Sequence, residues 1–253
     1  MIRLAAALAL TAGPLAAQDI FVLGEVHDNP AHHAVQAQRV SDMAPTAIVF
    51  EMLAPGQVAK ITPESRLDPR ALATALDWEN SGWPDFSFYY PILQAAPEAR
   101  LYGAHVPRSE TQAAAETGIV AAFGPRASEF GLPGPLPADQ QADREAMQSE
   151  AHCGALPVEV LPLMVEIQRL RDATLARAAL DALRDTGGPV AVITGNGHAR
   201  SDWGVPATIA LAAPDVEVHA LGQGENGAAP QGVFDEIASS PAPVRPDPCE
   251  AFR

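Results

Sequence analysis

Short apolar runs alternate with longer amphipathic segments along most of the chain. Four runs are short, continuous and bounded by turn or cap signals, which predicts buried strands at residues 20–24, 47–50, 189–194 and 216–221. Residues 101–106 form a weaker fifth candidate. Because continuous apolar strands are typical of sheets covered on both faces, the pattern favours a buried, mostly parallel sheet.

Helical patterns lie between these runs. Asn29 and Pro30 supply a cap and a first-turn proline for a helix that is expected to reach residue 43. A second helix is expected over residues 69–80, and a long one over 158–185 that ends at Gly187 and Gly188. The alternation predicts an α/β fold: a mostly parallel central sheet with helices on both faces.

Two segments depart from this alternation. Residues 107–157 consist of Ala-rich helical stretches broken by Gly and Pro, with no strand signal, and we expect residues 107–185 to form an inserted helical lid. The end of the chain, from about residue 225 to 253, is rich in Pro and Ala and is expected to be a tail. We therefore expect one α/β domain over residues 18–253.

Charge and composition narrow the class of partner. The 253 residues carry a formal net charge of −15, and 47% of them are hydrophobic. Nucleic acid and anionic membranes both reward a basic surface, so neither is expected as the main partner. The hydrophobic content is sufficient for a folded core and excludes a disordered chain.

The first 17 residues have the layout of a secretory signal. A single early cation, Arg3, precedes a short apolar stretch and then small residues, and the apolar run is too short to span a bilayer. We expect cleavage after Ala17, with a buried N-terminal helix as the alternative. No Cys lies near the cut, so the mature protein is expected to be periplasmic and not a lipoprotein.

The chain has two cysteines, Cys153 and Cys249. An even number in an exported protein favours a disulfide, which would fix the Pro-rich tail to the lid. The alternative is two unrelated buried thiols.

Polar residues gather where the predicted strands end. Glu25 and His27 follow the first strand, Glu51 follows the second, and His198 follows the strand at 189–194; both histidines stand in a G-x-x-H motif. In open α/β sheets the ligand crevice lies outside the carboxyl ends of the strands, so the four side chains are expected to converge there. Each residue taken alone has another explanation, since acids often cap helices and histidines often bond loop carbonyls.

A series of motifs then extends this picture. In chain order they are GEVHDNPAHHAVQ, VFEM, W-x-x-x-G-W-P-D-F-x-x-Y-Y-P-I (from Trp78 to Ile92), HCGALP, MVEIQRLRD and GNGHARSDWGVP. This series resembles the ChaN-like haem-binding proteins of the Tiki/TraB/erythromycin-esterase superfamily, and it covers most of the mature chain.

The resemblance implies haem binding for bacterial iron acquisition, at a dimer interface, with a tyrosine phenolate as iron ligand. Oxygen suits ferric iron, and tyrosine ligation of haem is known chemistry. The Tyr-x-Pro-Ile pattern points to Tyr89, with Tyr90 next; alternatively, both belong to an aromatic core segment. An outer-membrane haem receptor or a haem transporter is the further partner implied.

Haem also needs donors for its propionates. The nearest motif residues are His27, His33, His198 and Arg200, with Glu25 beside them. Arg171 is another choice, because it shares a helical face with Met164 and with polar residues that suit a ligand cavity. Alternatively, Arg171 forms a salt bridge with a buried carboxylate.

Two more histidines carry expectations. His105 stands where the family pattern leads us to expect Asn, and it either adds a ligand or is a strand histidine with satisfied hydrogen bonds. His32 lies in the first turn of a predicted surface helix and is expected to be solvated.

A hydrolase is the main rival function. His27 would serve as general base with Glu25 or Glu51, while His198 would stabilise the oxyanion; in a second form, Glu25, His27 and His198 would hold a divalent metal. A third possibility is a scaffold that retains these residues only as a buried hydrogen-bond network.

Overall fold

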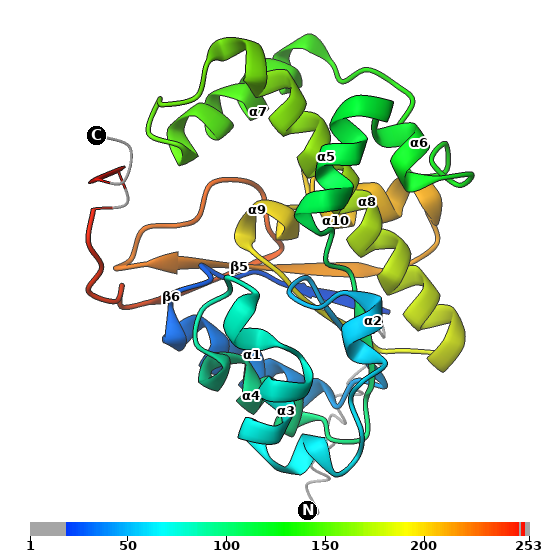
Figure 1. Ribbon diagram of the computed structural model, residues 1–253, viewed down its shortest axis with the longest axis vertical. Coiled ribbons are helices and arrows are strands. Elements are labelled where there is room, and N and C mark those ends of the chain that lie inside the picture. The colour runs from blue at the N-terminus through cyan, green and yellow to red at the C-terminus, as the bar shows by residue number, and fades with distance from the viewer. Residues whose placement is uncertain (1–18, 248, 251–253) are drawn as a thin grey trace, which may run out of the picture.

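The computed structural model describes residues 19–247 and 249–250. Its centre is a six-stranded sheet with the strand order β3-β2-β4-β1-β5-β6, in which every pair is parallel (Figure 1). The strands are β1 (Ile20–Leu23), β2 (Ala47–Phe50), β3 (Arg100–Gly103), β4 (Val190–Ile193), β5 (Val218–Glu225) and β6 (Glu236–Ser240). The predicted signal segment at residues 1–17 lies outside the described residues.

The sheet confirms the predicted α/β class and all five predicted strands, although β3 and β5 are shifted by one to four residues at their ends. The central strands β1, β2 and β4 are buried along nearly their whole length, which matches their continuous apolar sequence. β6 was not predicted. Its residues alternate between partly buried and exposed, as expected for an edge strand.

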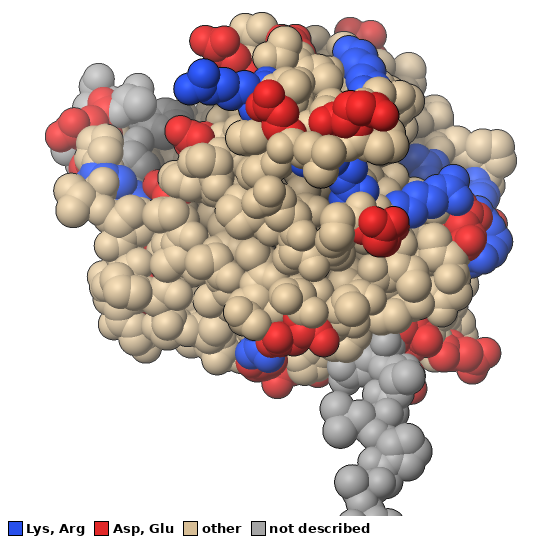
Figure 2. Space-filling model, turned by 90° about the horizontal axis from the view of Figure 1, so that it is seen from below, with Lys and Arg blue, Asp and Glu red and all other residues tan. Residues whose placement is uncertain are grey.

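One helical layer covers the face that Ile48, Phe50 and Ile193 present. It contains α1 (Pro30–Met43), α3 (Pro69–Ala75) and α4 (Phe86–Ala95), together with the 3₁₀ turns η1 (Ser65–Leu67) and η2 (Trp78–Asn80). Asn29 caps α1 as predicted, because its side chain accepts a hydrogen bond from the amide of Ala31. The helix predicted over 69–80 ends early, at Ala75, and resumes only as η2. Figure 2 looks onto this layer, and broad parts of it carry no charged side chain.

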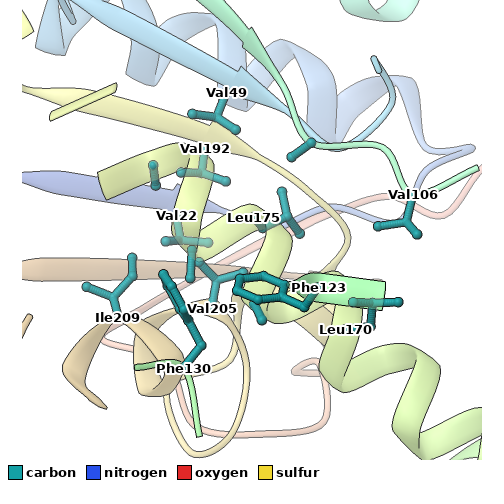
Figure 3. Close-up of a cluster of buried hydrophobic side chains, with 14 of the residues drawn as sticks. Val22, Val49, Val106, Phe123, Phe130, Leu170, Leu175, Val192, Val205 and Ile209 are labelled. Carbon is teal, nitrogen blue, oxygen red and sulfur yellow. The ribbon is translucent and has the colours of Figure 1, made fainter. Parts of the chain in front are cut away.

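The second layer covers the opposite face, and its main helix is α8. This layer contains α5 (Arg108–Thr117), α6 (Ile119–Phe123), α7 (Ala138–Ala151), η3 (Val158–Val160), α8 (Leu161–Thr186) and α10 (Val205–Ala212). Figure 3 shows how Val22, Val49 and Val192 of the sheet meet Leu175 of α8 and Ile209 of α10. Two short helices complete the chain's elements: α2 (Pro55–Val58) follows β2, and α9 (Asn196–Ala199) follows β4.

The segment expected to be one lid, residues 107–185, divides into two parts. α8 packs directly against β2 and β4, so it belongs to the layer that covers the sheet. α7 packs on α8, further from the sheet (Figure 1). α8 is therefore not part of a lid, and the lid role of the segment before it stays a prediction.

The tail from about residue 225 is more ordered than a Pro-rich composition suggests. β6 extends the sheet within it, and the predicted disulfide between Cys153 and Cys249 is present. Arg245 of the tail makes two hydrogen bonds each with Asp28 and Glu225, which fixes the tail beside the loop that follows β1. Along the described chain, no helix combines the length and apolarity needed to cross a membrane.

Candidate functional site

The loop after β1 brings Glu25 and His27 to one side, as their spacing of two predicts. His27 Nδ1 lies 2.8 Å from Glu25 Oε1, and the hydroxyl of Tyr89 donates to the same oxygen over 2.9 Å. His33 adds a third group: its Nδ1 lies 3.3 Å from Glu25 Oε2, and its Nε2 donates to the carbonyl of His27. Glu25 is only 2% exposed, so these groups replace water around it.

The first glycine of each G-x-x-H motif lies against the other motif. A Cβ atom on Gly24 would lie 2.6 Å from the side chain of Asn196, and one on Gly195 would lie 2.9 Å from His27 Nε2. Each glycine therefore lets its loop approach the loop of the other motif. The two histidines are brought to one place because neither glycine has a side chain.

Glu51 lies between the two loops. Its Oε2 accepts hydrogen bonds from the Thr194 hydroxyl (2.6 Å) and the Gly195 amide (2.9 Å), and its Oε1 lies 3.6 Å from His198 Nε2. The four side chains at the strand ends thus converge at the carboxyl edge of the sheet.

A chain of charges continues from His198 into the second layer. His198 Nδ1 lies 2.6 Å from Asp172 Oδ1 on α8, and Asp172 Oδ2 lies 4.0 Å from Arg144 on α7. The cluster therefore holds Glu25, His27, Glu51, His198, Asp172 and Arg144. With both histidines protonated, it contains three negative and three positive groups.

The surroundings favour the protonated form of His27. Burial opposes this charge, but the hydrogen bond to Glu25 and the charges of Glu51 and Glu25 outweigh it and raise the pKa of His27 to about 9. The pKa of His198 is also raised: burial opposes the charge, and Glu51 and Asp172 outweigh it. Burial alone would raise the pKa of Glu51, but His198 and His27 lower it to about 2. The pKa of about 9 makes His27 a cation and hydrogen-bond donor at neutral pH. In the pair His198–Asp172, burial also raises the pKa of Asp172.

A crevice of about 350 Å³ opens beside this cluster. Its apolar surface comes from Val26, Met147, Val165 and Trp203. Its polar surface comes from Glu25, His27, Arg144, Gln148, Gln168, Asp172, Asn196 and His198, with Gly195 and Gly197 between them. The crevice thus joins the strand-end loops to α7 and α8.

None of the tyrosines lines this crevice. Tyr89 is 1% exposed and lies behind Glu25, to which it donates its hydroxyl proton. Burial, the charge of Glu25 and this hydrogen bond raise the pKa of Tyr89, which disfavours the phenolate. Tyr90 donates to the carbonyl of Arg66, and Tyr102 donates to Asp185.

The other predicted site residues are only partly brought together. Arg200 is buried, but Asp202 pairs with it through two hydrogen bonds. Met164 is half-buried and lies outside the crevice lining, whereas Val165, Gln168 and Asp172 of the same helix line it. His105 stacks edge-on with Trp83, which in turn meets the ring of His27.

Arg171 is half-buried and makes no hydrogen bond or ion pair within the described part of the chain. The positive charge of Arg171 acts to lower the pKa values of His105 and His198, in each case less strongly than burial does. The pKa of His198 is nevertheless raised overall, because Glu51 and Asp172 outweigh both effects. The salt-bridge alternative for Arg171 is therefore not formed here.

The expectation that His32 is solvated was wrong. His32 is 0% exposed, since β5 and the tail cover this side of α1. Its Nδ1 accepts from the Val26 amide and its Nε2 donates to the carbonyl of Gly224, so it holds the loop before the site in place. Burial lowers the pKa of His32, in keeping with a neutral ring.

Sequence reasoning missed the contribution of α7. Arg144, Met147 and Gln148 all line the crevice. Their spacing of three and four residues places them on one helical face, and this pattern in DREAMQS was the signal that could have found them. Trp203, two residues before α10, was also missed as a lining residue.

The arrangement of the described acidic and histidine side chains does not support a divalent-metal site. Across residues 19–247 and 249–250, no group of three or more His, Cys, Asp or Glu side chains has the arrangement of a metal site.

Comparison with known protein families identifies the family of this chain. The sequence model described as "Haem-binding uptake, Tiki superfamily, ChaN" matches residues 11–209, which is well over half of the chain. The chain belongs to the ChaN family. The match includes both G-x-x-H loops, Glu51 and all of α7 and α8, and therefore every residue of the charged cluster.

Solved structures give the same fold. The structure described as cofacial haem binding to ChaN of Campylobacter jejuni is 20% identical, with a TM-score of 0.63 and 87% of each chain covered. The type III effector HopBA1 (11% identical, 88% of each chain, TM-score 0.47) and an erythromycin esterase mutant (13% identical, 84% of this chain and 71% of that one, TM-score 0.42) are more distant. The search of curated proteins returned no match.

Proposed function

We propose that this ChaN-family protein binds haem in the crevice between the strand-end loops and α7. The observation that carries the proposal is the lining of the crevice, where Trp203, Met147 and Val165 supply apolar surface beside cationic donors. Haem combines a flat apolar ring with two carboxylates, and this combination needs both kinds of surface. The C. jejuni structure, which belongs to the same family, is described as binding haem.

The residues present fit most of what haem requires. The protonated ring of His27 and the guanidinium of Arg144 are donors for propionates, and Gln148 and Asn196 add neutral donors. When bound, haem would supply the iron and the chemistry of that iron. The protein's own groups would hold the ring and its carboxylates and exclude water from one side of the ring.

Tyr89 is the proposed iron ligand, on the family pattern. Its hydroxyl is separated from the crevice by Glu25, which both accepts its hydrogen bond and lines the crevice. Ligation therefore requires that Tyr89 give up this hydrogen bond and that Glu25 move aside. To hold iron as a phenolate, Tyr89 would first have to pass its hydroxyl proton to Glu25, which accepts its hydrogen bond.

The cellular setting is also a proposal. An N-terminal segment with the layout of a secretory signal and a disulfide both suit the periplasm. We propose that haem links two copies of this chain and that the complex delivers haem to a receptor or transporter for iron acquisition. The family's description as haem-binding uptake supports this role.

A ferric-haem titration of the mature protein, followed by absorbance, tests the proposal. We expect saturable binding at one haem per chain and a shift toward dimer in size-exclusion chromatography. Tyr89→Phe should alter the Soret spectrum. Tyr90→Phe is the matched control, because the Tyr90 hydroxyl donates to the carbonyl of Arg66 and Tyr90 does not line the crevice. Absence of saturable binding would overturn the proposal, while identical spectra in all three proteins would remove Tyr89 as ligand.

A hydrolase is the second candidate, because the pair Asp172–His198 has the geometry of an acid–base dyad and adjoins the crevice. The roles suggested from sequence change, however. The pKa of His27 is about 9, so His27 would act as an acid or oxyanion donor rather than as a base at neutral pH, and the pKa of His198 is shifted in the same direction. Ester hydrolysis by the haem-free protein that is lost in His198→Gln would support this function.

A further inference from the structure

Arg144 is a buried cation that the protein leaves incompletely paired. It is 6% exposed and lies on α7, with its guanidinium carbon 5.1 Å from the ring centre of Trp203. One terminal nitrogen donates to the carbonyl of Trp203 over 3.2 Å, and the other lies 4.0 Å from Asp172 Oδ2. Its Nε–H has no acceptor among the described residues.

Two other buried arginines show what complete pairing looks like in the same layer. Arg169 donates to Glu166 and to the carbonyls of residues 131, 132 and 134. Arg200 binds Asp202 with two hydrogen bonds. By comparison, Arg144 has only a distant carboxylate, and that carboxylate already binds His198 at 2.6 Å.

An incompletely paired guanidinium is costly to bury, because a charged donor loses water without gaining a partner. A ligand carboxylate would satisfy both the free Nε–H and the charge, and guanidinium–carboxylate pairs are among the strong hydrogen bonds in proteins. The position suits this role, since Arg144 lines the crevice and also a second cavity of about 130 Å³ behind it. The two cavities share Arg144, Asp172 and Trp203.

The side chains of the crevice that could hold iron are largely engaged elsewhere. Tyr89 is closed off by Glu25, and Tyr90 and Tyr102 are bonded outside the crevice. His27 and His198 line the crevice, but each has a ring nitrogen on a carboxylate, Glu25 and Asp172 respectively. Arg144, with its free Nε–H, is therefore better placed for an acid group of a porphyrin than these groups are for its metal.

We propose that Arg144 binds a carboxylate of the porphyrin, and that the crevice recognises a dicarboxylate porphyrin whether or not it contains iron. This inference rests on the proposed haem-binding function and names the ligand class of the same crevice. Within the predicted lid, α7 would then be the helix that recognises the ligand.

The test compares mesoporphyrin IX, which contains no metal, with its dimethyl ester, which lacks both charges. Binding to the mature protein is followed by porphyrin fluorescence and by quenching of tryptophan emission. We expect the free acid to bind within a few-fold of ferric haem and the ester to bind at least tenfold more weakly. Arg144→Gln should weaken binding of the acid on the order of 10- to 100-fold and leave the ester unchanged.

Two variants complete the design. Arg144→Lys keeps the charge and should retain part of the preference for the acid, and Arg70→Gln removes an exposed arginine of α3 as a control for net charge. If Arg144→Gln does not fold, the preference for the free acid over the ester is still measured in the wild-type protein and in Arg144→Lys. A preference in the wild type that is reduced in Arg144→Lys would support binding of the carboxylate by Arg144.

Each other outcome has a distinct meaning. Equal weakening of acid and ester by Arg144→Gln would show a structural role for Arg144 and overturn the inference. Binding of ferric haem without binding of the metal-free acid would also overturn it, since recognition would then depend on iron, while the proposed function would stand. Failure of every porphyrin to bind would overturn both.

Discussion

The sheet is packed by two different kinds of side chain on its two faces. Against α8 the interface is rich in small residues: beside Leu175, the side chains of Ala173, Ala176, Ala179 and Ala182 are all fully buried there. Against α1, α3 and α4 it is built from large ones, including Phe50, Trp78, Phe86 and Tyr89. Small residues let a long helix lie close to the sheet, whereas the aromatic layer fills a wider space.

The two faces also contribute different residues to the site. The aromatic layer supplies Tyr89 and His33, which hold Glu25 from behind. The alanine-lined helix supplies Asp172, which holds His198, and carries α7 above it. The two histidines of the twin motifs are therefore positioned from opposite faces of one sheet. Loss of side-chain volume should destabilise the aromatic face most, and gain of volume should destabilise the α8 face most.

Loss of volume should be the most damaging change on the aromatic face. Phe50→Ala removes a side chain that is 1% exposed and leaves a cavity, so we expect the free energy of unfolding to fall by about 3–5 kcal/mol. Urea unfolding measures the change. Val49→Ala is the neighbouring control on the other face and should cost less, because it removes less volume; an equal or larger loss would contradict the comparison.

A covalent link joins the segment after α7 to the tail. The disulfide joins residues 96 positions apart, so Cys153→Ser with Cys249→Ser should lower the free energy of unfolding by about 2–5 kcal/mol. The same effect is expected from reduction of the native protein, measured by thermal unfolding with and without dithiothreitol. Unchanged stability in both experiments would show that β6 and Arg245 hold the tail without the disulfide.

Gain of volume should be the damaging change on the α8 face. Ala176→Leu adds three carbons to a fully buried position beside the sheet and should cost about 1–3 kcal/mol. The control is Ala113→Leu on the exposed side of α5, where the same change meets solvent. If both variants are as stable as the wild type, α8 does not lie as close to the sheet as its alanines indicate.

The smallest effect concerns the pair Glu25–His27. The pKa of His27 is about 9 in the folded protein and 6.5 as its ordinary value, so folding favours the proton. Its stabilisation is complete below pH 6.5 and is lost as the pH rises through 9. About a third of the side chain is exposed, so solvent screening limits the expected loss to about 1 kcal/mol. Unfolding of His27→Gln over the same pH range isolates this contribution, and a parallel profile for both proteins would refute it.

Much of the sheet could be predicted from sequence, because buried parallel strands are continuous apolar runs that need no knowledge of their neighbours. β6 could not, since Glu236–Ser240 has little apolar character and gains its conformation from pairing with β5. The helix α4 was also not predicted, because its aromatic residues and Pro91 are poor helix formers.

The convergence of Glu25, His27, Glu51 and His198 followed from topology alone. The roles of Tyr89, Arg144 and His32 did not, because each depends on which element packs over it. Tyr89 is enclosed by α1 residues such as His33, Arg144 is brought in by a lid helix, and His32 is covered by β5. Local patterns report the face of a helix but not the element that will cover it.

The link between Cys153 and Cys249 makes the second half of the protein a closed ring. The loop at residues 226–233 is largely exposed, as are loops that proteases cut first. A single cut there would leave both fragments joined through sulfur, with Arg245 still bound to Asp28 beside the crevice. Nicked protein would thus migrate as one molecule until it is reduced, and the tail would keep its place beside the loop that follows β1 although the backbone is cut.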